Sequence, residues 1–315
     1  KSKKTIIFWW KLGWFIIFVA NQSYLMKITN ILIFSFLILM ISCKKKLEKK
    51  EDLPATTEQK VSTKSANVSI LKKEFVIENL NDISHKVWLY LPPNYENSDE
   101  KYPVIYMHDA QNLFDDATSF VGEWDVDGTL NTLYEKTGKG FIVVAVENGG
   151  EKRIEEYTPY KNEKYGGGKG DIYIDFLANE LKPYIDKNYK TLTTPENTAL
   201  IGSSLGGLIS FYGGLKYPEV FGKIGALSTS FWFSSDKIND FTKENGNQQN
   251  TKIYFLVGEK EGDSMVPDTE NMAKLLVDLG FPAENIKTKI VAEGKHTESF
   301  WKAEFLEVIE FLYNI

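Results

Sequence analysis

A serine placed between two glycines is the feature of this sequence that points most directly to chemistry. The apolar run 198–201 leads into Gly202-Ser203-Ser204-Leu205-Gly206, and the residues up to about Lys216 have helical spacing. A strand, a sharp turn and a helix are the context that a nucleophile elbow requires. Ser204 has glycines two positions away on both sides, and Ser203 does not. We therefore predict that Ser204 is a nucleophile; the alternative is that small residues only allow a helix to pack closely on a strand.

A serine hydroxyl becomes a good nucleophile when a base removes its proton, and imidazole is the usual base. The sequence contains three histidines, His85, His108 and His296. Only His296 completes the chain order serine, acid, histidine that accompanies this kind of elbow. We expect His296 to be the base, His108 to lie near the site at the end of the strand 103–108, and His85 to be a surface residue.

The acid that orients the histidine should follow the strand expected at 252–257. The next loop reads Gly258-Glu259-Lys260-Glu261-Gly262-Asp263 and offers three carboxylates. One of them would hold His296 in the correct tautomer and stabilise the imidazolium. Position alone does not choose among the three, because most acidic loop residues are simply solvated.

A tetrahedral oxyanion needs two hydrogen-bond donors aimed at it. We expect one donor to be the backbone N–H of Leu205, which follows the nucleophile at the start of a helix, where N–H groups are free. The other donor should come from the loop 109–115, which follows the strand 103–108.

Aromatic residues near these segments are candidates for the walls of an acyl or alcohol pocket: Trp124, Tyr157, Trp232 and Trp301. Each could equally be a core ring, because aromatic residues make up 14% of the sequence. The loop carboxylates Asp109, Asp115 and Asp116 lack clustered histidines and are more typical of turns and caps. We expect no metal, and the chemistry needs no cofactor.

A framework of alternating strands and helices must position these candidates. The expected strands are 103–108, 141–146, 198–201, 223–227, 252–257 and 287–291, and the expected helices are 125–136, 171–188, 205–216, 269–279 and 298–312. Such alternation predicts an α/β fold with a mainly parallel sheet and helices on both faces. Two antiparallel strands, 74–78 and 86–91, are expected to open the sheet. Sites in such sheets lie beyond the carboxyl ends of the strands.

Composition limits the class of partner. The chain has 315 residues, 43% of them hydrophobic, and a formal net charge of −6. The first 43 positions hold five of the 37 basic residues and no acidic one, so the rest carries 32 basic against 43 acidic residues, a net −11. This acidity argues against nucleic acid as a partner. Residues 68–315 are expected to form one catalytic domain.

The region 1–43 has the composition of an export signal. Lys27 precedes the short apolar run 31–41, and the segment that ends at Cys43 resembles a bacterial lipoprotein signal, in which the cysteine becomes lipidated. The run is too short for a comfortable transmembrane helix. Another apolar stretch precedes it, so we expect Met26 to be the true start. A membrane hairpin and an ordinary secretory signal are the alternatives.

Residues 44–67 are rich in Lys, Glu, Thr and Ser and contain few apolar residues. This composition predicts a flexible tether. We therefore expect an exported protein that a lipid holds at the cell envelope, with its catalytic domain at a distance from the membrane.

Several segments are similar, in order and spacing, to the putative esterase family. The similarity covers about residues 70–313, and the segments are Tyr106-Met107-His108-Asp109-Ala110-Gln111-Asn112-Leu113-Phe114-Asp115, Gly122-Glu123-Trp124, Glu156-Tyr157-Thr158-Pro159, Ile201-Gly202-Ser203-Ser204-Leu205-Gly206-Gly207 and Pro218-Glu219-Val220-Phe221. That family includes esterase D, enterochelin esterase-like hydrolases, bacterial feruloyl and acetyl xylan esterases, and the antigen 85 mycolyltransferases.

The resemblance implies an α/β-hydrolase fold with Ser204 as nucleophile and His296 as base. It places the acid at Glu261, three residues after the glycine that ends its strand, with Asp263 as the alternative. It assigns the second oxyanion donor to the backbone N–H of Gln111. The sequence departs from the family at the preceding residue, Ala110, where many relatives have glycine, so the approach of this loop to the carbonyl could differ.

The sequence therefore predicts a serine carboxylic-ester hydrolase that forms an acyl-enzyme and acts on acyl esters of carbohydrates or on small acyl esters. The alternatives are an acyltransferase with the same triad, an enterochelin-type siderophore esterase and a non-catalytic binding module at the envelope. An anionic siderophore would favour several basic residues around the pocket. The domain is acidic, and Arg153 is the only arginine in the chain.

Overall fold

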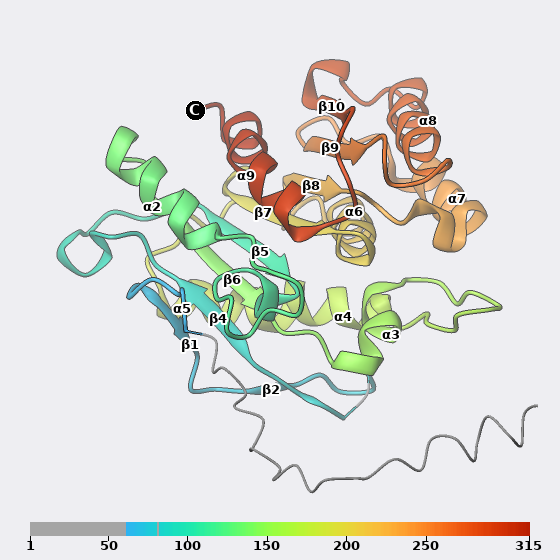
Figure 1. Cartoon of the computed structure of the whole chain (residues 1–315). Helices are drawn as coiled ribbons and strands as arrows, with labels where there is room; N and C mark the ends of the chain where they lie inside the picture. Colours follow the sequence, from blue (N-terminus) through green and yellow to red (C-terminus); the bar gives the residue numbers. More distant parts are fainter. Residues whose placement is uncertain (1–60, 81) are drawn as a thin grey trace, which may run out of the picture. The chain divides into compact units, whose positions relative to one another are not determined.

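The computed structural model describes residues 61–80 and 82–315. The predicted signal, the lipidation at Cys43, the start at Met26 and most of the tether lie outside the described residues. An eight-stranded sheet forms the centre of the described part (Figure 1), and its strands in spatial order are β1 (Val68–Ile70), β4 (Val87–Tyr90), β6 (Ile142–Val146), β5 (Val104–His108), β7 (Thr198–Ser203), β8 (Lys223–Leu227), β9 (Lys252–Gly258) and β10 (Ile286–Val291).

The six strands from β6 to β10 are parallel, and the two strands at the other edge are antiparallel. The mainly parallel sheet is therefore confirmed. The identity of the first edge strand differs from the prediction, because β1 and not 74–78 pairs with β4, with Val68 opposite Tyr90. Within 74–78, only β2 (Phe75–Val76) is extended, and it pairs with β3 (Ser84–His85) in a separate two-stranded sheet. Once β1 occupies the edge of β4, no ladder positions remain there for a second strand.

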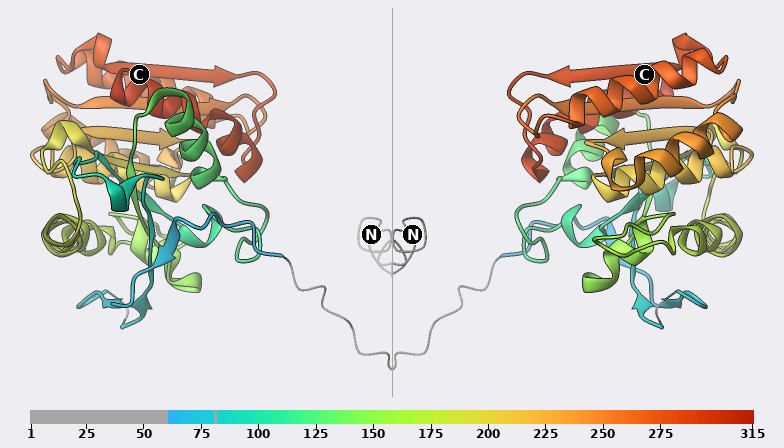
Figure 2. Two further views of the ribbon diagram at one scale, coloured as in Figure 1. Left: turned by 90° about the vertical axis from the view of Figure 1, so that its left-hand side faces the viewer. Right: turned by 90° about the vertical axis from the view of Figure 1, so that its right-hand side faces the viewer.

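Helices cover both faces of the sheet (Figures 1 and 2), and they are α2 (Val126–Thr137), α3 (Arg153–Tyr157), α4 (Gly170–Phe176), α5 (Lys182–Asn188), α6 (Leu205–Lys216), α7 (Ser235–Asn245), α8 (Met265–Asp278) and α9 (Glu298–Tyr313). Side chains on β5 alternate between the two cores. Met107 packs in the core that contains α2 and α9, and Tyr106 packs in the core that contains α4, α6 and α8. Sequence periodicity did not identify α3 and α7.

The helix predicted over 171–188 is interrupted in its middle. A π-helical turn, Leu177–Leu181, separates α4 from α5. Pro183 is the second residue of α5. Proline has no N–H to donate to the preceding turn, so the regular i to i−4 ladder cannot continue through it.

The last residues of the predicted tether are part of the domain. The Ser62 hydroxyl donates to Asp115 Oδ2 at 2.6 Å, the Ser65 N–H donates to Asp127 Oδ2 at 2.7 Å, and the Asn67 side chain donates to the Leu91 carbonyl at 2.6 Å. These hydrogen bonds attach the end of the segment 44–67 to the domain, which the composition of the segment does not predict. Across 61–80 and 82–315, no helix is both long enough and apolar enough to cross a membrane.

Candidate active site

Ser204 occupies the turn between β7 and α6. Its backbone has φ 59° and ψ −122°, and its N–H donates to the Leu227 carbonyl at 2.9 Å. A Cβ on Gly202 would lie 2.6 Å from the backbone of Gly206, closer than real contacts allow. Gly202 therefore allows strand and helix to meet at this turn. The Ser204 hydroxyl lies 3.3 Å from Ser230 Oγ.

His296 and Glu261 are hydrogen-bonded to each other. His296 Nδ1 lies 2.9 Å from Glu261 Oε2. The Glu261 side chain is fully buried, and its Oε1 accepts hydrogen bonds from the Gly258 N–H at 2.7 Å and the Ser228 hydroxyl at 2.8 Å. Asp263 is exposed, and of these two carboxylates only Glu261 contacts His296 in the described part of the chain. The geometry favours Glu261 over Asp263.

Two glycines bring the loops of Glu261 and His296 together. A Cβ on Gly258 would lie 2.2 Å from the Gly294 carbonyl oxygen, so the two backbones touch where a side chain would keep them apart. The Lys260 N–H donates to that same carbonyl at 3.0 Å. A glycine at the end of β9 and another shortly after β10 are a signal in the sequence that could have identified this contact.

The two expected oxyanion donors come from two separate segments of the chain. Leu205 is the first residue of α6, and Gln111 lies in a short 3₁₀ turn, Ala110–Asn112. Neither backbone N–H has a hydrogen-bond partner among the described residues. Ala110 is buried, with 1% of its surface exposed, so its methyl group is accommodated in the core.

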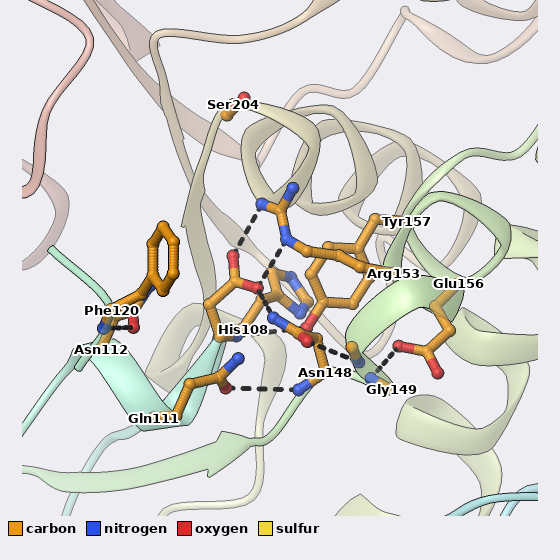
Figure 3. A network of polar contacts seen from close by, with 12 residues as sticks. His108, Gln111, Asn112, Phe120, Asn148, Gly149, Arg153, Glu156, Tyr157 and Ser204 are labelled. Carbon is orange, nitrogen blue, oxygen red and sulfur yellow. Dashed lines mark hydrogen bonds and ion pairs between the residues drawn. The ribbon is translucent and has the colours of Figure 1, made fainter. Parts of the chain in front are cut away.

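Arg153 holds the start of the loop 109–115, the expected source of the second oxyanion donor, through Asp109. Asp109 has φ 58°, and its carboxylate accepts from Arg153 Nε at 2.7 Å and Nη2 at 2.8 Å. Asn148 donates to the same carboxylate at 2.5 Å, and the Asp109 N–H donates to the Tyr157 hydroxyl at 3.1 Å. Figure 3 shows the Arg153 guanidinium directed toward Ser204. Burial raises the pKa of Asp109, but the charge and hydrogen bonds of Arg153 outweigh it, and the pKa is lowered overall.

We expect the Arg153→Gln variant to lose about 10²-fold in kcat, because a small displacement of a positioned group can cost that much. Arg153→Lys should recover little, since an ammonium cannot reproduce the bidentate contact with Asp109. Steady-state kinetics on p-nitrophenyl acetate measures both effects. Lys152→Gln is the matched control, because the Lys152 side chain is 48% exposed and pairs with Glu155 at the surface. Full kcat in Arg153→Gln would contradict a positioning role.

A pocket of about 610 Å³ joins these elements, and its lining residues are His108, Asp109, Gln111, Asn112, Leu113, Phe120, Val121, Trp124, Asn148, Gly150, Arg153, Ser203, Ser204, His296, Glu298 and Trp301. Phe120 is 89% exposed, and forms an apolar lip with Val121. Burial raises the pKa of Glu298, at the start of α9. Sequence reasoning did not select Phe120, Asn148 or Glu298. Asn148 lies two residues after the end of β6, so the rule that sites lie at the carboxyl ends of strands could have found it.

The candidate pocket aromatics separate into two groups. Trp124 and Trp301 line the pocket, with ring centroids 5.6 Å apart. Tyr157 does not line it, because its ring is fully buried beneath Asp109. Trp232 is 44% exposed and packs against Tyr165 outside the pocket lining. In the described ranges, no group of three His, Cys, Asp or Glu side chains could hold a metal ion.

The two other histidines have structural contacts. His85 is buried, which corrects the expectation of a surface residue, and its Nε2 contacts Glu156 Oε1 at 2.9 Å. His108 contacts Tyr173 Oη at 2.9 Å and Ser210 Oγ at 3.0 Å, so both of its nitrogens are occupied. Burial lowers the pKa of His108 from 6.5 to about 4.

This lowered pKa predicts a loss of stability in acid. The unfolded chain binds a proton at His108 below about pH 6.5, whereas the folded chain does so only near pH 4. The contribution of His108 to the free energy of unfolding is therefore complete above pH 6.5. It is lost as the pH falls toward 4, which lowers the free energy of unfolding by about 3 kcal/mol. Urea unfolding at pH 7 and pH 4.5 should show a smaller loss for His108→Gln than for the wild type. Equal losses would contradict the assignment.

Known proteins resemble this chain along most of its described part. A family model described as "Putative esterase" matches residues 80–312. The uncharacterized protein YbbA of Bacillus subtilis is 27% identical over 241 residues, which are 72% of this chain and 91% of that protein. An endo-1,4-beta-xylanase/feruloyl esterase of Xylanibacter ruminicola is 32% identical over 240 residues, which are 72% of this chain and 29% of that protein.

A solved structure shares the fold. It is an IroE-like serine hydrolase from Shewanella oneidensis, which is 19% identical with a TM-score of 0.61 and covers 78% of this chain and 79% of its own. The strand order, the helices on both faces and the family match agree with one another. The chain belongs to the putative esterase family, and it is a carboxylic ester hydrolase with an α/β-hydrolase fold.

Proposed function

We propose that this protein hydrolyses carboxylic esters through an acyl-enzyme, with Ser204 as nucleophile, His296 as base and Glu261 as the acid that orients it. The observation that carries the proposal is the hydrogen bond of His296 Nδ1 to the buried Glu261, in a pocket that His296 shares with Ser204. Because Nδ1 is engaged by the carboxylate, Nε2 is the nitrogen left to take a proton.

In acylation, Ser204 Oγ bonds to the ester carbonyl carbon while its proton passes to His296 Nε2. The carbonyl oxygen becomes an oxyanion that accepts hydrogen bonds from the backbone N–H groups of Leu205 and Gln111. When the carbon–oxygen bond to the alcohol breaks, His296 gives its proton to the leaving alkoxide. A water molecule then attacks the acyl-enzyme by the same steps, which frees the acid and restores the serine.

The proposed substrates are acyl esters of carbohydrates or small acyl esters. The apolar lip of Phe120 and Val121 and the indole of Trp124 suit an acyl group better than a highly charged ligand. Asp109 already engages Arg153, and the Glu298 carboxylate stands in the same pocket, so anionic substrates gain little there. The relative from Xylanibacter ruminicola, named for xylanase and feruloyl esterase activities, supports this choice.

The location at the envelope through a lipid on Cys43 is also part of the proposal. Metabolic labelling with a fatty acid in a bacterial host, followed by membrane fractionation, tests it. The wild type should carry the label and sediment with membranes, and Cys43→Ser should do neither.

A substrate panel tests the reaction itself. Acetyl, feruloyl and catecholate siderophore esters should be compared by kcat/KM, with the acetylated or feruloylated sugars expected to be the better substrates. Preference for the siderophore ester would overturn the substrate proposal. An added sugar or lipid alcohol distinguishes hydrolysis from acyl transfer, because transfer would divert product from the free acid to a new ester. No hydrolysis of any p-nitrophenyl ester would favour a binding module.

A further inference from the structure

We propose that Ser228 and Trp301 are positioning residues that hold the carboxylate of Glu261 in the orientation His296 requires. This inference rests on the proposed triad. Trp301 Nε1 lies 2.8 Å from Ser228 Oγ, and Ser228 Oγ lies 2.8 Å from Glu261 Oε1. The three side chains form a relay that ends at the triad acid.

The chemistry of the donors fixes the direction of this relay. An indole N–H can only donate, so Ser228 Oγ accepts from Trp301 and is left to give its own proton to Glu261. The Gly258 N–H donates to the same carboxylate oxygen at 2.7 Å. With two donors on Oε1, the carboxylate cannot rotate without losing a hydrogen bond, and Oε2 remains directed at His296.

The backbone of Ser228 indicates that its hydroxyl has a purpose. Ser228 directly follows β8 and has φ 45°, a conformation that glycine adopts far more easily than serine. It is fully buried, and its N–H donates to the Leu256 carbonyl at 2.7 Å. A serine at this strained position is explained if its hydroxyl makes a hydrogen bond that glycine could not make.

Trp301 also contacts His296, the partner of Glu261. Its ring meets the His296 ring edge-on, with centroids 5.1 Å apart and an interplanar angle of 85°. Trp301 is 5% exposed and also lines the pocket. One indole therefore restrains the histidine by contact and the glutamate through Ser228.

Kinetics on p-nitrophenyl acetate tests the relay. Ser228→Ala should lower kcat about 10- to 100-fold, the value of a hydrogen bond to a charged group, and leave KM unchanged because Ser228 does not line the pocket. Trp301→Phe should lower kcat by a smaller factor. The double variant should lose less than the product of the two single losses, because the part of the indole's effect that reaches Glu261 passes through the serine. Multiplicative losses in the double variant would overturn the relay.

A proton NMR signature separates positioning from a loss of stability. The downfield Nδ1 proton of His296 should shift or broaden in Ser228→Ala and in Trp301→Phe. Trp88→Phe is the matched control, since Trp88 is 2% exposed and its Nε1 donates to Glu147 at 2.7 Å. It should keep both the resonance and kcat, even if it lowers the melting temperature.

The outcomes also separate this inference from the proposed function. If wild-type protein reacts with a fluorophosphonate but the signal and kcat survive in Ser228→Ala and Trp301→Phe, the relay is wrong and the triad stands. If the wild type does not react at Ser204, the proposed function itself fails. Should Ser228→Ala not fold, Ser228→Gly takes its place, because glycine also lacks the hydroxyl and adopts φ 45° without strain.

Discussion

Replacing Ser204 by alanine is expected to lower kcat by about 10⁵- to 10⁶-fold, the scale reported for removal of a triad nucleophile. The fold should hardly change. The N–H contact with Leu227 remains, and the only side-chain hydrogen bond lost within 61–80 and 82–315 is the 3.3 Å contact with Ser230. The free energy of unfolding should therefore stay within about 0.5 kcal/mol of the wild type. Ester hydrolysis and urea unfolding measure the two quantities on the same preparation.

The neighbouring serine provides the control for register. Ser203 is the last residue of β7 and also lines the pocket. The positions two residues before and after it hold Ile201 and Leu205 instead of glycine. A fluorophosphonate should label Ser203→Ala and fail to label Ser204→Ala. The reverse result would move the nucleophile by one residue and contradict the assignment of the elbow.

The turn at Ser204 and the mainly parallel sheet could be predicted because their signals are local. Gly202 and Gly206 stand two residues from Ser204, and each buried strand is a continuous apolar run. The position of His296 after the last strand needed only the chain order and the rule that sites lie at carboxyl ends. These are properties of short segments, and tertiary packing did not override them.

Two features could not be predicted from local patterns, the choice between Glu261 and Asp263 and the shape of the loop 109–115. Both depend on contacts between residues that are distant in sequence. Glu261 is distinguished from Asp263 by burial and by its bond to a histidine 35 positions later. Arg153 meets Asp109 across 44 positions, which no periodicity reveals. His85 was misplaced for the same reason, since its buried partner, Glu156, lies 71 positions away.

Replacing Glu261 by glutamine should lower kcat by about 10⁴-fold while leaving KM unchanged, because Glu261 does not line the pocket. The donors from Gly258 and Ser228 require an acceptor at the position of Oε1, so the amide oxygen will take that place. The amide NH₂ group then faces His296 Nδ1 and donates to it.

That donation forces the imidazole into the tautomer with its proton on Nε2, which cannot accept a proton from Ser204. Asp263→Asn is the matched control, since it makes the same chemical change on an exposed side chain two residues away and should keep wild-type kcat. If Asp263→Asn lost activity and Glu261→Gln kept it, the acid would be Asp263, and the contact seen between Glu261 and His296 would not be the one that supports catalysis.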